Sequence, residues 1–186
     1  MGRGIAEAVG EAGAFVVAGD LQFETVAETI GIIKARGSRG LAIELDVTSN
    51  ESVADAVRRA VSEFGRLDGL VNNAGVCRMG SALEARTEDR DIQHAVNVEG
   101  LYSCCQLAVR QMMEQESGGA IVNIASEAGK VGYPNSAFYN ATKAAVISLT
   151  RTMAQEWSGA GINVNAVCPG GVNTAMLYSV AQWRGG

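Results

Sequence analysis

The feature that most restricts the fold is a regular alternation of short apolar runs with longer amphipathic segments along the chain. The apolar runs have the length of strands and cover residues 14–18, 41–45, 67–71, 120–126 and 162–168. Segments with helical periodicity lie around them, at residues 3–12, 24–35, 51–64, 91–115 and 137–157. Nearly continuous apolar strands that alternate with helices are typical of a parallel sheet covered on both faces. The pattern predicts an α/β fold in a single domain over residues 1–186.

Composition excludes several classes of protein. The 186 residues are 47% hydrophobic, which is enough for a buried core. A net charge of −5 argues against nucleic acid or an anionic membrane as partner, and no apolar stretch reaches the roughly 18 residues that cross a bilayer. The four cysteines form no Cys-x-x-Cys pair and there is one histidine, so we expect no metal site and a reduced, cytoplasmic setting. The single histidine also argues against Ser-His-Asp hydrolysis.

Tyr139 and Lys143 are the first candidates for catalysis. On a helix, positions i and i+4 share one face, so the lysine ammonium would lie one turn from the phenol. A neighbouring positive charge favours the phenolate and lowers a pKa that starts near about 10, which gives an acid/base group usable near neutral pH. Ser126 lies 13 residues before the tyrosine, at the end of an apolar run, and can hydrogen-bond the same oxygen. Taken alone, a Tyr-x-x-x-Lys pair is more often an amphipathic surface feature.

Further motifs follow in a fixed order. Asn-Asn-Ala-Gly at 72–75 follows an apolar run, Asn97 lies in a helical segment, and Pro-Gly-Gly-Val-Asn-Thr at 169–174 follows the last apolar run. Together with the serine and the Tyr-x-x-x-Lys motif, this set resembles the short-chain dehydrogenase/reductase family over nearly the whole chain. The resemblance implies a doubly wound, Rossmann-like sheet and an NAD(P)-dependent oxidoreductase.

The resemblance also implies which residues contact the cofactor. Asp20 is expected to accept hydrogen bonds from the adenosine ribose, and its carboxylate would repel the 2′-phosphate of NADP, so we expect NAD. The competing interpretation is that Asp20 only caps the next helix. Asp46 and Val47 resemble the adenine-contacting pair of the family. The other expected contacts are Gly2, Asn73, Ala74, Gly75, Tyr139, Lys143, Pro169, Gly170, Val172 and Thr174.

The glycine-rich phosphate loop of the family is only partly present. Gly2 matches its last glycine, because it lies 11 residues before Gly13 of a Gly-Ala pair that leads into the next strand. The family's first strand, its earlier glycines and its last strand have no counterpart in residues 1–186. We therefore expect a chain that is incomplete at both ends and that neither folds stably nor binds NAD well by itself. A fragment, a misassigned start and a real truncated product all remain open.

The mechanism that the resemblance implies divides the work among four side chains. Tyr139 exchanges a proton with the substrate oxygen, and Ser126 orients that oxygen. Lys143 bonds the nicotinamide ribose and keeps the tyrosine pKa low, and Asn97 holds a water that links the lysine to solvent. A hydride passes between the cofactor and a small-molecule alcohol or ketone. The family also implies a homo-oligomer, often a tetramer.

The substrate is not determined by these motifs. Selectivity is expected to lie in residues 127–135 and in the segment after 174, where Met176, Leu177, Tyr178 and Trp183 could line a pocket or begin an ordinary helix. Sugars or polyols, steroids, acyl-carrier-protein thioesters and small ketones all remain open. The alternatives to an NAD-dependent dehydrogenase are an NADP-dependent 3-oxoacyl reductase and a non-catalytic truncated product.

Overall fold

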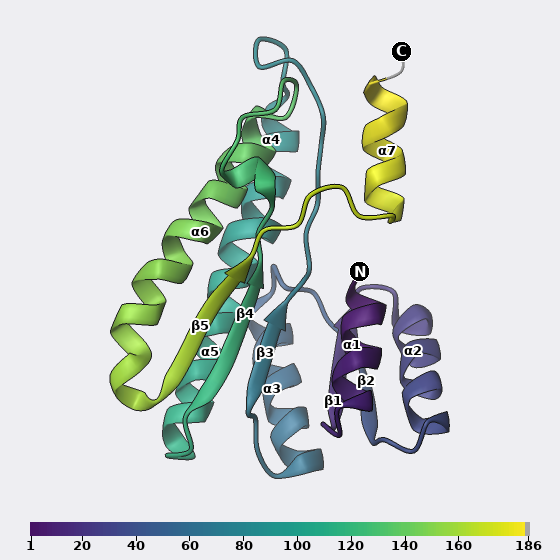
Figure 1. Ribbon diagram of the computed structural model, residues 1–186, viewed down its shortest axis with the longest axis vertical. Coiled ribbons are helices and arrows are strands. Elements are labelled where there is room, and N and C mark those ends of the chain that lie inside the picture. The colour runs from purple at the N-terminus through teal and green to yellow at the C-terminus, as the bar shows by residue number, and fades with distance from the viewer. Residues whose placement is uncertain (185–186) are drawn as a thin grey trace.

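Parallel strands alternate with helices throughout the chain (Figure 1). The structure is a computed structural model that describes the backbone of residues 1–184 and the side chains of residues 1–178 and 180. The strands are β1 (Val16–Asp20), β2 (Gly40–Glu44), β3 (Gly69–Asn72), β4 (Gly119–Ile124) and β5 (Ile162–Val167). The helices are α1 (Gly2–Glu11), α2 (Phe23–Ala35), α3 (Asn50–Phe64), α4 (Thr87–His94), α5 (Leu101–Glu114), α6 (Ala137–Trp157) and α7 (Ala175–Arg184). The α/β prediction is confirmed.

The sheet is divided into two parts. β1 pairs in parallel with β2, and β3, β4 and β5 form a second parallel sheet in that order. Among the described strands none pairs across the division between β1 and β3. In the doubly wound order one further strand lies at this place, so the expected incompleteness of the sheet is confirmed.

The helices cover the two sheets unequally. Val16, Ala18 and Ala42 of the smaller sheet pack against α1 and α2. In the larger sheet, Ile162 and Val164 of β5 are buried in the core beneath α5 and α6, whereas the intervening residue 163 is exposed. Within the described residues the prediction of cover on both faces is therefore wrong for β5. Its side chains alternate between core and solvent, as in a half-buried strand.

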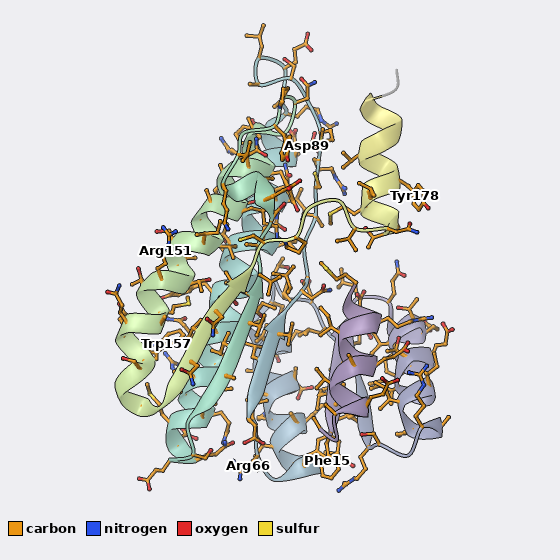
Figure 2. The ribbon with its side chains drawn as sticks, in the orientation of Figure 1. Phe15, Arg66, Asp89, Arg151, Trp157 and Tyr178 are labelled. Carbon is orange, nitrogen blue, oxygen red and sulfur yellow. The ribbon has the colours of Figure 1, made fainter. Side chains whose placement is uncertain are left out.

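A cation–aromatic cluster links the smaller sheet to α3. The Arg39 guanidinium lies 4.6 Å from the ring centroid of Phe15 and 5.0 Å from that of Phe64, and the two ring centroids are 5.4 Å apart. Figure 2 shows Phe15 at the amino-terminal end of the strands. The cluster therefore lies at the amino-terminal end of the strands, opposite to their carboxyl ends, where the sequence motifs lie.

The helix expected over residues 91–115 differs most from the structure. It begins earlier, at Thr87, and is interrupted by a π-helical turn, Ala95–Gly100, between α4 and α5. The backbone makes close contact here: a methyl group added to Gly100 would lie 2.9 Å from the carbonyl oxygen of Val47. Single π-helical turns of this kind occur frequently at functional sites.

A chain of buried polar side chains joins β3, β4 and α6. Asn72 Nδ2 donates to Asn123 Oδ1 at 2.9 Å, and Asn123 Nδ2 donates to Thr150 Oγ1 at 3.0 Å. Asn72 Nδ2 also lies 3.2 Å from the sulfur of Cys105 on α5. Burial raises the pKa of this thiol to about 12, and of Cys104 to about 11, so both pack as neutral thiols.

We predict that Asn123→Ala strongly destabilises the fold, because it removes the bonding partner of two buried polar groups. The expected loss in the free energy of unfolding is about 2–4 kcal/mol. Denaturant titration of the full-length protein measures it. Asn163→Ala is the matched control, since this asparagine is exposed on the next strand and its loss should change stability by no more than about 0.5 kcal/mol. Equal stability of the two variants would contradict the prediction.

Candidate active site

The predicted site residues gather at the carboxyl ends of the strands. Because all paired strands are parallel, the segments that follow β1, β3, β4 and β5 leave the sheets at the same edge. This edge is the upper end of the strand arrows in Figure 1, and the first turn of α1 also lies there. Ligands of doubly wound proteins bind at this edge.

Ser126, Tyr139 and Lys143 come together as predicted. Tyr139 lies in the first turn of α6 and Lys143 one turn later, with its Nζ 5.8 Å from the centroid of the tyrosine ring. Lys143 is only 5% exposed, and its Nζ donates to the carbonyl oxygen of Ile124 at 2.8 Å, which fixes the ammonium against the end of β4. The Ser126 hydroxyl is hydrogen-bonded to Tyr139 and also accepts from the backbone N–H of Ala128 at 3.1 Å.

Burial has an unexpected effect on the two ionisable groups. The pKa of Tyr139 is raised above its ordinary value because burial disfavours the phenolate, although the hydrogen bond from Ser126 acts in the opposite direction. Burial also lowers the pKa of Lys143 to about 8. The pKa of Tyr139 therefore shifts in the direction opposite to the one expected from the neighbouring lysine. Desolvation is the largest cause of this shift.

Asn97 is fully buried on the π-helical turn, and its amide is used by three protein groups. Its Oδ1 accepts from the N–H of Val76 at 2.8 Å, and its Nδ2 donates to the carbonyl of Val76 at 2.9 Å and to Thr142 Oγ1 at 3.1 Å. Asn97 thus ties the segment after β3 to α6, next to Lys143. Thr142 is not among the residues expected from the sequence. Its position directly before Lys143, inside the Tyr-x-x-x-Lys motif, is the feature that could have identified it.

The two acidic residues expected at the cofactor lie at the ends of β1 and β2. Asp20 is exposed, and its Oδ1 accepts from the N–H of Gln22, the residue that precedes α2, at 3.0 Å. One carboxylate oxygen therefore orders the turn before α2. It does not cap the helix, because Gln22 is the N-cap residue and no side-chain bond caps α2. Asp46 accepts from the hydroxyl and the N–H of Thr48 at 2.7 and 2.8 Å, and these bonds lower its pKa. Val47 packs against Gly100.

Gly2 and Asn73 meet at the start of α1, although they are far apart in the sequence. A methyl group on Gly2 would lie 2.8 Å from Asn73 Nδ2, so only glycine allows this approach. Asn73 Oδ1 is buried and has no hydrogen-bond partner among the described residues. After Ala74, a methyl group on Gly75 would lie 3.4 Å from Asn97 Oδ1 and 3.6 Å from Lys143 Nζ. The unsatisfied Asn73 Oδ1 and the space left by Gly2 and Gly75 are compatible with a dinucleotide bound at this edge.

The segment after β5 completes the edge. The carbonyl of Pro169 accepts from the N–H of Glu127 at 2.9 Å, which joins this segment to the one that carries Ser126. Thr174 Oγ1 donates to the carbonyl of Val172 at 3.2 Å and accepts from the N–H of Leu177 at 3.4 Å, at the start of α7. Tyr178 is exposed on α7 (Figure 2). The side chain of Trp183 lies outside the described residues.

The described part of the chain contains neither a metal-binding group nor a membrane-spanning helix. No three Asp, Glu, Cys or His side chains are placed to hold a metal ion. None of the described helices has the length and apolar character that crossing a membrane requires.

The parallel fold and the Ser-Tyr-Lys group at its carboxyl edge define an oxidoreductase of the NAD(P)-dependent class. A family model described as short chain dehydrogenase matches residues 1–185. The chain belongs to the short-chain dehydrogenase/reductase family.

Named relatives and solved structures agree with this assignment. The chain is 36% identical over 182 residues to the oxidoreductase UcpA of Escherichia coli K12, covering 98% of this chain and 69% of the relative. It is 40% identical over 183 residues to the 3-oxoacyl-acyl-carrier-protein reductase FabG of Staphylococcus aureus, covering 98% of this chain and 74% of FabG. A crystal structure of a short-chain type dehydrogenase/reductase from Mycobacterium marinum superposes with a TM-score of 0.95 at 31% identity, covering 99% of this chain and 73% of that chain.

We predict that Lys143 titrates near pH 8 in the cofactor-free protein, well below the ordinary lysine value of 10.5, because its ammonium is desolvated. The unfolded chain still holds this proton between the two values, so this group makes the folded state more stable as pH rises from 8 to 10.5. NMR of the side-chain carbons next to the amines of the three lysines follows the titration. Lys143→Met should remove the early transition and the exposed-site control Lys34→Met should keep it. A wild-type spectrum without a transition near pH 8 would contradict the prediction.

Proposed function

We propose that this protein is an NAD-dependent dehydrogenase that interconverts a secondary alcohol and a ketone. The observation that carries the proposal is the arrangement of Ser126, Tyr139 and Lys143, which places a serine beside a half-buried phenol and a buried amine. Such a group can exchange a proton with a C–O group. Bound at the same edge, the nicotinamide would supply or accept the hydride.

Each side chain has one task in this proposal. In oxidation, the alcohol carbon loses a hydride to the nicotinamide while its hydroxyl loses a proton to the Tyr139 phenolate. Ser126 donates a hydrogen bond that stabilises the phenolate and orients the substrate oxygen. Lys143 holds the nicotinamide ribose, and its charge favours the phenolate. Asn97 keeps the lysine-bearing turn in place and, as the resemblance implies, connects the lysine to solvent through a water.

The cofactor proposal is NAD rather than NADP. Asp20 uses one carboxylate oxygen for the turn before α2, and its side chain is exposed at the end of β1. A carboxylate in this position accepts hydrogen bonds from a ribose diol and repels a 2′-phosphate. The contacts proposed for the rest of the cofactor are those at the same edge: Gly2, Asp46, Val47, Asn73, Ala74, Gly75, Pro169, Gly170, Val172 and Thr174.

The second candidate is an NADP-dependent 3-oxoacyl reductase, which the 40% identity to FabG favours. A non-catalytic truncated product is the alternative from another class, and turnover by residues 1–186 themselves would exclude it. We further propose a homo-oligomer that packs through α5 and α6, because Tyr102 and Met113 are exposed on α5. Thiols without disulfides favour a reducing, cytoplasmic setting.

We predict that Tyr139→Phe in the full-length protein lowers kcat by about 10²–10⁴-fold, because it removes only the proton-transferring hydroxyl. The affinity for NAD should change little. Absorbance of the reduced nicotinamide gives the rate and titration calorimetry gives the affinity. Ser62→Ala removes an exposed hydroxyl on α3 and should leave both unchanged. Wild-type turnover by the Tyr139 variant would refute the assignment.

We predict that the wild-type protein prefers NAD to NADP and that Asp20→Ala narrows the preference about tenfold or more. The reason is the repulsion between the carboxylate and the 2′-phosphate in a partly desolvated site. The ratio of kcat/KM for the two cofactors measures it. Asp55→Ala removes an exposed carboxylate on α3 and should leave the ratio unchanged. Equal use of NADP by the wild-type protein would show that Asp20 does not select the cofactor.

A further inference from the structure

The side chain of Glu127 joins three segments of the candidate active site. Glu127 directly follows Ser126 and opens a 3-10 turn, Glu127–Gly129. Its backbone N–H donates to the carbonyl of Pro169 at 2.9 Å, and its Oε1 accepts from the hydroxyl of Tyr133 at 2.8 Å. Hydrogen bonds at the backbone N–H and at the carboxylate therefore hold Glu127 in place.

The carboxylate lies beside the segment that follows β5. A methyl group added to Gly170 would lie 3.1 Å from Glu127 Oε2 and 3.5 Å from Oε1. The glycine thus leaves room for the carboxylate next to the segment proposed to line the nicotinamide. In the chain, Glu127 directly follows Ser126, which acts on the pKa of Tyr139. The Glu127 carboxylate therefore places a negative charge beside the segment after β5, on the residue next to Ser126.

The two carboxylate oxygens are not equivalent. Oε1 accepts a hydrogen bond from the Tyr133 hydroxyl, whereas Oε2 has no hydrogen-bond donor among the described residues. The Glu127 side chain is exposed. An ionised carboxylate only accepts hydrogen bonds, so Oε2 can bind a hydroxyl group of a substrate and repels an anion. One such bond to a charged group corresponds to a difference in kcat/KM of about 10–100-fold.

We propose that Glu127 is a specificity-determining residue that selects substrates with a second hydroxyl group next to the reacting carbinol. The substrate class is then vicinal diols and polyols, in preference to simple secondary alcohols and anionic hydroxy acids. The inference rests on the proposed dehydrogenase function and narrows its substrate. Oxidation of such a diol yields a hydroxyketone, with the hydride passing to NAD and the proton to Tyr139, while the second hydroxyl remains intact and bound to Glu127.

The test compares three substrates that differ in one feature. 2,3-Butanediol and 2-butanol differ by a single hydroxyl group, and 3-hydroxybutyrate adds a negative charge. With the full-length protein and NAD, we expect kcat/KM for the diol to exceed that for each of the other two by tenfold or more. Glu127→Ala should lower the diol value about 10–100-fold and leave 2-butanol within about twofold. Glu127→Gln should raise the value for 3-hydroxybutyrate, because it removes only the charge.

Two controls separate selectivity from a structural role. Glu114→Gln removes an exposed carboxylate on α5 and should leave every ratio unchanged. Tyr133→Phe frees Oε1 but keeps the charge, so it should raise KM for the diol without admitting the anion. If 2-butanol serves as well as the diol, or if Glu127→Ala lowers both equally, the specificity proposal is wrong while the dehydrogenase proposal stands. If none of the three alcohols reduces NAD, the specificity proposal is overturned, and turnover of other secondary alcohols then decides the dehydrogenase proposal.

Discussion

The buried amide of Asn97 is the interaction on which the site depends. It binds both backbone groups of Val76 and the hydroxyl of Thr142, so it joins the segment after β3 to α6 through a single side chain. The π-helical turn brings this side chain inward. An unsatisfied buried amide is costly, so loss of any one of the three contacts would weaken the link between the two segments. The bond to Thr142 connects α6 to this link at the residue next to Lys143.

The same packing that positions Tyr139 and Lys143 also makes them harder to charge. Burial raises the pKa of Tyr139 and lowers that of Lys143, and Ser126 counteracts the effect on the tyrosine. In the proposed mechanism Ser126 would therefore serve both the substrate oxygen and the phenolate. In a site of this kind the side chains are held precisely, but burial makes them harder to ionise.

Buried and exposed parts of the candidate site are separated along the strand direction. Asn72, Asn123 and Thr150 form a buried chain that joins β3, β4 and α6. At the carboxyl edge, Glu127 contacts Tyr133, and α7 exposes Tyr178 and further apolar side chains. Residues that bind ligands lie disproportionately on loops, which a packed scaffold positions. In the proposal for Glu127, a carboxylate between the two parts influences the choice of substrate without disturbing proton transfer.

The sequence by itself determined the α/β fold, the order of the motifs and the grouping of Ser126, Tyr139 and Lys143, because strand alternation and the i, i+4 relation are local and periodic. Only the tertiary structure decided the break in the helix at Asn97, the upward shift of the Tyr139 pKa and the contact of Glu127 with Gly170. These properties depend on desolvation and on groups from distant segments, which no local window of sequence contains. Periodicity is thus readable from the chain, whereas burial is a property of the assembled fold.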